Sequence, residues 1–126
     1  MIELDFKKQN GLIPCIFQDS KTKRVLMLGY MNELAWQKTL ETGNVHYWSR
    51  SRNKLWLKGE SSGHTQKVHE IYFDCDNDTV LILGEQIGGA ACHLGYASCF
   101  FNKVESDDVV TINEDKVFNP DDVYKK

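Results

Sequence analysis

Two apolar runs separated by a short polar segment stand near the start of the chain. The runs cover residues 12–17 and 25–30, and residues 18–23 between them are polar. Apolar runs joined by such a loop are typical of a β-hairpin. The pattern therefore predicts that these two segments pair as antiparallel strands.

The stretch that follows predicts the main helix, from Glu33 to about Thr42. Asn32 is a favourable N-cap, and the carboxylate of Glu33 suits the positive end of a helix. Gly43 can end the helix, because glycine readily adopts the left-handed conformation that closes a helix C-terminus.

The remaining chain has the pattern of strands. Aromatic and β-branched residues dominate residues 45–49, 55–58, 67–74 and 80–86, and shorter segments of this kind follow at 99–101, 109–112 and 117–118. Asn53 and Asn77 are suitable turn residues between them. Asn119 before Pro120 predicts the start of a last short helix.

These elements predict a strand-dominated α+β fold, with a mostly antiparallel sheet and one main helix. The 126 residues suit a single domain. The composition becomes acidic and polar after Val104. We therefore expect residues 1–104 to form the domain, and residues 105–126 to form an acidic extension packed on it.

Charge and cysteine content limit the classes of function. A net charge of −3 argues against a broad basic surface, so we expect no nucleic-acid partner. The first residues lack an apolar run long enough for a signal peptide or a membrane span, which predicts a cytoplasmic protein without a membrane partner. In a reducing compartment, clustered cysteines indicate metal binding or catalysis more often than disulfides.

The first candidate site is an acidic segment around Cys75. In an extended strand Asp74, Asp76 and Asp78 would share one face and Cys75 would point the other way. Three crowded carboxylates suit a hard cation such as Mg²⁺. The alternative is a solvated acidic turn, in which Asn77 and Asp78 reverse a hairpin.

The second candidate site is the glycine-rich segment 88–99, which contains Cys92, His93 and Cys99. Zinc prefers thiolate and imidazole ligands, and Cys75 could supply a third sulfur. Three protein ligands and a water are the catalytic arrangement, in which the pKa of the water falls to about 7. His93 could be a fourth ligand or a general base. The alternative is buried cysteines in a flexible loop.

The third candidate site is the basic, serine-rich segment 47–64. Arg50, Arg52 and Lys58 could bind phosphate, since guanidinium groups bind it with two hydrogen bonds and glycines let backbone N–H groups approach it. Trp48 and Trp56 could stack on a base or pack in the core. The alternative is a charged hairpin that turns at Asn53.

Together these motifs resemble the phosphoribosyl-AMP cyclohydrolase family. The matching stretches are GLIP at 11–14, VLMLGYMN at 25–32, WSRSR at 48–52, KGESSG at 58–63, DCDND at 74–78, CH at 92–93 and SCFF at 98–101. The resemblance implies an intertwined homodimer in which zinc is shared between subunits, with Cys75 from one and Cys92 and Cys99 from the other. It also implies magnesium at Asp74, Asp76 and Asp78.

The reaction implied by this resemblance is a step of histidine biosynthesis. Water opens the N1–C6 bond of the adenine ring of 1-(5-phosphoribosyl)-AMP, giving the phosphoribosylformimino-carboxamide nucleotide. His93 is the first candidate for proton transfer and His64 the second. Arg50, Arg52 and Lys58 are the candidates for binding the phosphate groups of the substrate.

The sequence also departs from its relatives. Tyr96 and Ala97 stand in the interval where many relatives carry an arginine, so a polar contact expected there is in question. Many bacterial relatives continue into a second domain that hydrolyses the pyrophosphate of the preceding intermediate. The sequence ends at Lys126, so we expect the monofunctional form.

Two other functions fit parts of the sequence. A zinc-dependent nucleobase deaminase would show His-x-Glu and a later Pro-Cys-x-x-Cys, whereas here His69 and Glu70 are adjacent and the second motif is absent. A non-enzymatic, zinc-stabilised RNA-binding module could use Trp48, Trp56 and the arginines. The three aspartates argue against it, because RNA repels carboxylates.

Overall fold

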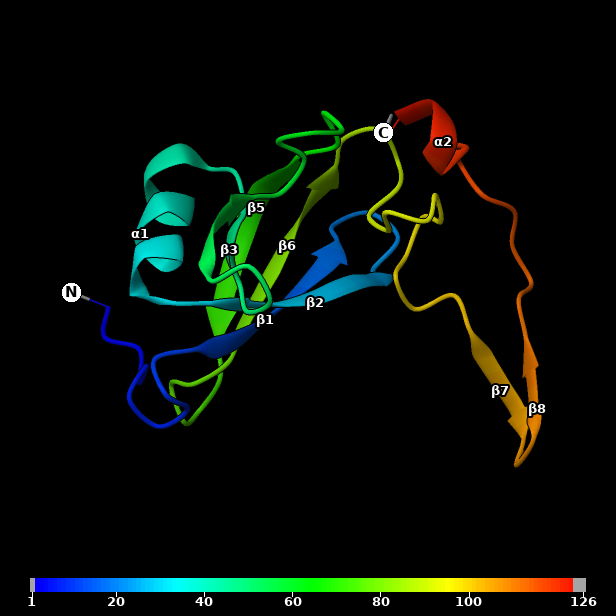
Figure 1. Ribbon diagram of the computed structural model, residues 1–126. Coiled ribbons are helices and arrows are strands. Elements are labelled where there is room, and N and C mark those ends of the chain that lie inside the picture. The colour runs from blue at the N-terminus through cyan, green and yellow to red at the C-terminus, as the bar shows by residue number, and fades with distance from the viewer. Residues whose placement is uncertain (1, 124–126) are drawn as a thin grey trace.

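The computed structural model describes residues 2–123, and a four-stranded sheet lies at its centre (Figure 1). The strands run in the order β2 (Val25–Met31), β1 (Ile13–Asp19), β6 (Val80–Gln86) and β5 (Gln66–Phe73). β1 pairs with β2 and β5 pairs with β6 in antiparallel fashion, whereas β1 and β6 are parallel. The strand-dominated α+β prediction is confirmed, but the sheet is mixed.

The predicted hairpin and helix both form. β1 and β2 pair from Ile13 with Met31 onward. In α1 (Glu33–Thr42), the Asn32 side chain accepts a hydrogen bond from the Ala35 N–H at 2.9 Å, and Gly43 has a φ of 74°. The two caps predicted from the sequence therefore fix both ends of this helix.

The core lies where the sheet meets α1 and a second hairpin, formed by β3 (His46–Ser49) and β4 (Lys54–Leu57). Alternate residues of β1 are fully buried, as expected for a strand with one covered face. Tyr47 from β3 is also buried, and its hydroxyl donates a hydrogen bond to Gln66 at 2.6 Å. Full burial of a large apolar side chain stabilises the fold by about 1.5–3 kcal/mol, so this layer holds the second hairpin on the sheet.

The acidic segment is a turn rather than a strand. β5 ends at Phe73, residues 74–79 are outside the strands, and Asn77 has a φ of 59°. The Asp74 carboxylate accepts hydrogen bonds from the N–H groups of Asp78 and Thr79, at 2.9 and 3.2 Å. The structure therefore confirms the alternative of an acidic turn, and the segment is not an extended strand with Cys75 on its opposite face. Local hydrogen bonding by Asp and Asn side chains favours a turn here.

The C-terminal part begins with a hairpin of β7 (Lys103–Ser106) and β8 (Val109–Thr111), which extends away from the main sheet (Figure 1). The sequence indicated β8 but missed β7. The strands predicted at 99–101 and 117–118 are wrong, because backbone groups there bond to loops and to the edge strand β2. The last helix, α2 (Pro120–Val123), forms with the Asn119 side chain accepting the Asp121 N–H.

Met1 and residues 124–126 lie outside the described residues, so the two ends of the predicted domain and extension are not covered. Within residues 2–123, no helix has the length and apolar character needed to cross a membrane.

Candidate active site

A pocket of about 510 Å³ lies where the β3–β4 hairpin meets the loop that follows β6. Most of its lining comes from the basic, serine-rich segment, and Met27, Ala91, His93 and Cys99 complete it. Four of the predicted site residues thus share one pocket: Arg52, Lys58, His93 and Cys99.

A tight turn after β4 presents polar groups to this pocket. Gly59 has a φ of 87°, and a Cβ atom there would lie 2.5 Å from the backbone carbon of His64. The Gly63 N–H donates to the Gly59 carbonyl at 2.7 Å and closes the turn. Glu60, Ser61 and Ser62 line the pocket as a result, although they were not among the predicted site residues. The flanking glycines of the KGESSG motif were the signal that could have identified them.

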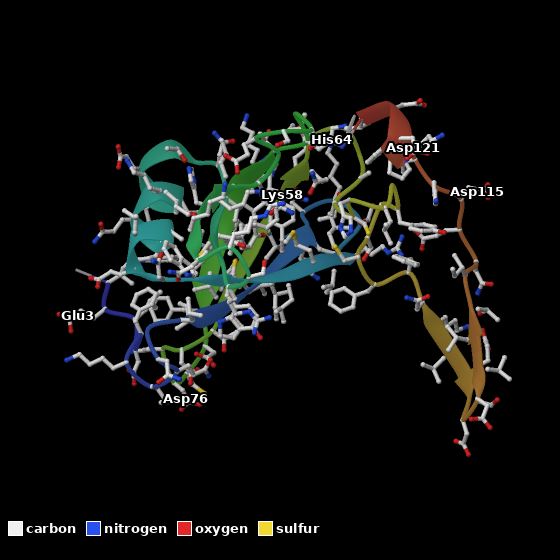
Figure 2. The ribbon with its side chains drawn as sticks, viewed as in Figure 1. Glu3, Lys58, His64, Asp76, Asp115 and Asp121 are labelled. Atoms are coloured by element: carbon white, nitrogen blue, oxygen red, sulfur yellow. The ribbon has the colours of Figure 1, made fainter. Side chains whose placement is uncertain are left out.

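Lys58 lies inside the protein, at the centre of the molecule (Figure 2). Lys58 is only 5% exposed, and its ammonium group donates a hydrogen bond to the Ala91 carbonyl at 2.6 Å. Burial lowers the pKa of Lys58, while the nearby thiols of Cys99 and Cys92 act in the opposite direction. Lys58 therefore places a cation beside two sulfur atoms.

Cys92 and Cys99 come together at the base of a closed loop. Hydrogen bonds from the Ala91 N–H to the Ala97 carbonyl and from the Cys92 N–H to the Tyr96 carbonyl close the loop, at 3.1 and 3.2 Å. Burial raises the pKa of Cys99 to about 11, and the hydrogen-bonded thiol of Cys92 raises it in the same direction. Both thiols suit zinc, which binds them as thiolates and displaces their protons.

Cys75 is exposed and lies far from these two thiols. It stands in the turn before β6, whereas Cys92 follows the other end of this seven-residue strand. A strand rises about 3.3 Å per residue, so the two ends of β6 lie roughly 20 Å apart. The three cysteines therefore do not meet within one chain, and a zinc ion held by all three needs a second copy.

The three predicted aspartates do converge. Ligand atoms of Asp74, Asp76 and Asp78 lie within 4.8 Å of one another, and within residues 2–123 no other group of three or more acidic, cysteine or histidine residues meets this condition. The backbone N–H of Asp78 holds the pKa of Asp74 below its usual range. Lys8 contacts Asp78 at 3.2 Å. The carboxylate oxygens of this cluster suit Mg²⁺. Figure 2 shows Asp76 at the opposite end of the molecule from His64.

The other predicted residues lie outside the first pocket. The Arg50 guanidinium stacks over the Tyr30 ring at 3.9 Å and lines a second pocket of about 490 Å³, which adjoins the first at Ser49, Ser51 and Trp56. His64 lines neither of these two pockets of the described chain. Its ring packs edge-on against Phe118 at 5.0 Å, and its Nδ1 atom is buried without a hydrogen-bond partner among residues 2–123.

Known proteins resemble the whole chain. Residues 27–101 match the model of the family described as phosphoribosyl-AMP cyclohydrolase. A phosphoribosyl-AMP cyclohydrolase of Desulforapulum autotrophicum is 62% identical over 125 residues, which cover 99% of this chain and 100% of the relative. Another, from Desulfatibacillum aliphaticivorans, is 59% identical over 126 residues and covers 100% of both chains. A third, from Methanosarcina acetivorans, is 55% identical over 125 residues, covering 98% of this chain and 100% of the relative.

The chain belongs to the phosphoribosyl-AMP cyclohydrolase family. The resemblance read from the motifs is confirmed, and the chain is an enzyme of histidine biosynthesis rather than a deaminase or an RNA-binding module. The pocket of this cyclohydrolase is lined by residues between Met27 and Cys99, all of which fall within the matched region. The chain after residue 101 lies beyond that region.

Proposed function

We propose that the pocket beside Cys99 binds 1-(5-phosphoribosyl)-AMP and that water opens the N1–C6 bond of its adenine ring there. The observation that carries this proposal is a pocket with many polar donors that is lined by Cys99, His93 and the buried Lys58, with the thiol of Cys92 next to that of Cys99. A volume of about 510 Å³ is within the range of about 300–1,000 Å³ that is usual for small-molecule sites.

The zinc ligands in this proposal are Cys92 and Cys99 of one chain and Cys75 of a second copy. Zinc held by these three sulfurs would lower the pKa of a water molecule to about 7 and so would supply the nucleophile at neutral pH. The exposed position of Cys75 supports sharing between copies, because its sulfur is accessible from outside its own chain. The proposed assembly is thus a homodimer with two complete sites.

The residues around the pocket have separate tasks. His93 is exposed at the pocket and can take a proton from the attacking water and return it to the leaving ring nitrogen. Arg52 and the hydroxyls of Ser61 and Ser62 offer hydrogen bonds to phosphate. The aromatic ring of Trp56 can pack against the purine.

Magnesium in this proposal binds at Asp74, Asp76 and Asp78. Asp74 is already oriented by two backbone N–H groups, and Lys8 offsets part of the negative charge. These three carboxylates belong to the same turn as Cys75, so a cation there also orders the segment that supplies the third sulfur to a second copy.

An absorbance assay with phosphoribosyl-AMP, run before and after chelation, tests the function on the purified chain. We expect turnover without ammonia release, about one zinc per chain, and loss of both zinc and turnover in Cys92→Ser, which stays folded. Cys15→Ala is the matched control, because this buried cysteine lies in β1 and lines neither the first nor the second pocket. Full activity of Cys92→Ser without zinc contradicts the proposal, and ammonia release indicates deamination instead.

A further inference from the structure

Residues 114–118, here called the C-terminal strap, cross the outer side of the loop that carries the thiols. The Val117 N–H donates to the Gly95 carbonyl at 2.6 Å, and the Phe118 N–H approaches the same oxygen at 3.4 Å. Gly95 has a φ of 100°, and a Cβ atom there would lie 2.2 Å from the Phe118 carbonyl oxygen. The loop and the strap therefore touch backbone to backbone, which only glycine permits at position 95.

Side chains of the strap extend this contact to both sides of the loop. The Lys116 ammonium lies 5.8 Å from the centre of the Tyr96 ring. The Phe118 ring packs against His64, which stands just after the turn that lines the pocket. The His64 ring in turn fills the space beside Gly88, where a Cβ atom would lie 2.4 Å from it. The strap thus connects the thiol loop to the polar turn across the pocket.

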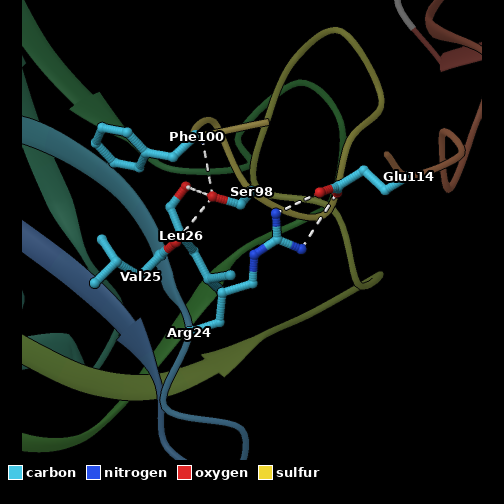
Figure 3. A network of polar contacts seen from close by, with 6 residues as sticks. All are labelled: Arg24, Val25, Leu26, Ser98, Phe100 and Glu114. Carbon is cyan, nitrogen blue, oxygen red and sulfur yellow. Dashed lines mark hydrogen bonds and ion pairs between the residues drawn. The ribbon is translucent and has the colours of Figure 1, made fainter. Parts of the chain in front are cut away.

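The strap is tied to Arg24, the residue just before β2, and β2 is the strand that holds the far end of the loop. Glu114 pairs with Arg24 through both carboxylate oxygens, one of them at 3.3 Å (Figure 3). Immediately after Arg24, the carbonyl of Val25 accepts the Ser98 hydroxyl at 2.8 Å, and the carbonyl of Leu26 accepts the Cys99 N–H at 2.7 Å. The loop therefore lies between the start of β2 and the strap. The Arg24–Glu114 ion pair links these two segments.

We infer that the C-terminal strap is a positioning element for zinc binding, which keeps Cys92 next to Cys99 through Gly95. This inference rests on the zinc site of the proposed function. The strap lies beyond the region matched by the family model, and its contacts with Gly95, Tyr96, His64 and Arg24 are with residues other than the proposed zinc ligands. A loop that is already ordered loses less conformational entropy when it binds an ion, so releasing the strap weakens zinc binding.

The test is a charge swap on the full chain, measured by zinc competition with a chromophoric chelator. Arg24→Glu and Glu114→Arg should each weaken zinc binding about fivefold, and the double variant Arg24→Glu/Glu114→Arg should recover most of it. Lys103→Glu is the matched control, because it breaks the Lys103–Glu105 pair on the projecting hairpin and should leave zinc affinity unchanged. If Arg24→Glu fails to fold, Glu114→Gln supplies the same measurement with a smaller change.

The outcomes separate this inference from the proposed function. If the unaltered chain binds zinc, and the swapped variants bind it equally well while unfolding at lower temperature, the strap is only a structural brace and the inference is overturned. Failure of the double variant to recover affinity also overturns it, because the ion pair is then not the connection. If the unaltered chain binds no zinc, the zinc site of the proposed function fails as well.

Discussion

The ammonium group of Lys58 is in an unusual place, because lysine side chains are mostly exposed at protein surfaces. It is buried, bonded to the carbonyl of Ala91, and close to the thiols of Cys92 and Cys99. Thiolates that bind a metal carry negative charge into this buried region, and an unpaired buried charge costs several kcal/mol, on the order of 3–5. We therefore expect Lys58 to offset the charge of metal-bound thiolates, while its contact with phosphate stays a prediction from the sequence.

Two substitutions of Lys58 distinguish the effect of its charge on zinc binding from the effect of its hydrogen bond. Lys58→Gln keeps a hydrogen-bond donor and loses the charge, and we expect zinc affinity to fall about tenfold, or about 1.4 kcal/mol, because the thiolates lose the nearby cation that offsets their charge. Lys58→Met loses both and should bind zinc more weakly still. Chelator competition measures the affinities, and Lys54→Gln, an exposed lysine on the same pocket, is the control. Zinc affinity in Lys58→Met equal to that of the unaltered chain argues against this role.

The sequence predicted correctly those elements whose ends are set by nearby capping or turn residues. Helix α1 was predicted within its observed bounds because Asn32 and Gly43 act through neighbouring backbone groups. For the acidic segment the sequence allowed both a strand with a shared face and a turn, and the hydrogen bonds that Asp74 accepts from the N–H groups of residues 78 and 79 favour the turn. The parallel pairing of β1 with β6 joins segments some sixty residues apart, and no local pattern shows it.

In the acidic turn, Asp74 stabilises the turn itself, whereas Asp76 is expected only to bind magnesium. Asp74→Ala removes the two hydrogen bonds that the carboxylate accepts from backbone N–H groups, so we expect the urea midpoint of unfolding to fall even without magnesium, and further than in Asp76→Ala. Asp76 is exposed, so Asp76→Ala should leave this midpoint almost unchanged. Both variants should lose the extra stability that magnesium gives the unaltered chain. Urea unfolding with and without magnesium measures these effects, and an unchanged response to magnesium in Asp76→Ala contradicts the site.

The candidate residues could be predicted from the sequence, and the family resemblance also implied that Cys75 serves a second subunit. Motifs and the family resemblance identified the cysteines, the aspartates and His93, because each type of side chain suits a definite chemistry. Packing between distant segments decides three features that the sequence did not show. These are the burial of Lys58, the packing of His64 against Phe118 and the contact of the strap with Gly95. The separation of Cys75 from the other two thiols agrees with the sharing that the resemblance implied, so the proposed zinc site needs a second copy.

Mixing two inactive variants tests whether the zinc site is shared. In a dimer of one Cys75→Ser chain and one Cys92→Ser chain, one site keeps all three cysteines and the other lacks two. We expect each variant alone to be inactive, and the co-refolded equimolar mixture to recover about a quarter of the unaltered activity, because about half of its dimers are mixed.

The matched control is a mixture of Cys92→Ser with Cys99→Ser. These two sulfurs come from the same chain in the proposed arrangement, so every site of that mixed dimer lacks a ligand and the mixture should stay inactive. Turnover and zinc content measured on purified mixed dimers check both results. Recovery by the control pair, or its absence in the first pair despite mixed dimers, shows that Cys75 does not complete the site of a neighbouring chain. The separation of Cys75 from Cys92 by the length of β6 leads us to expect recovery in the first pair only.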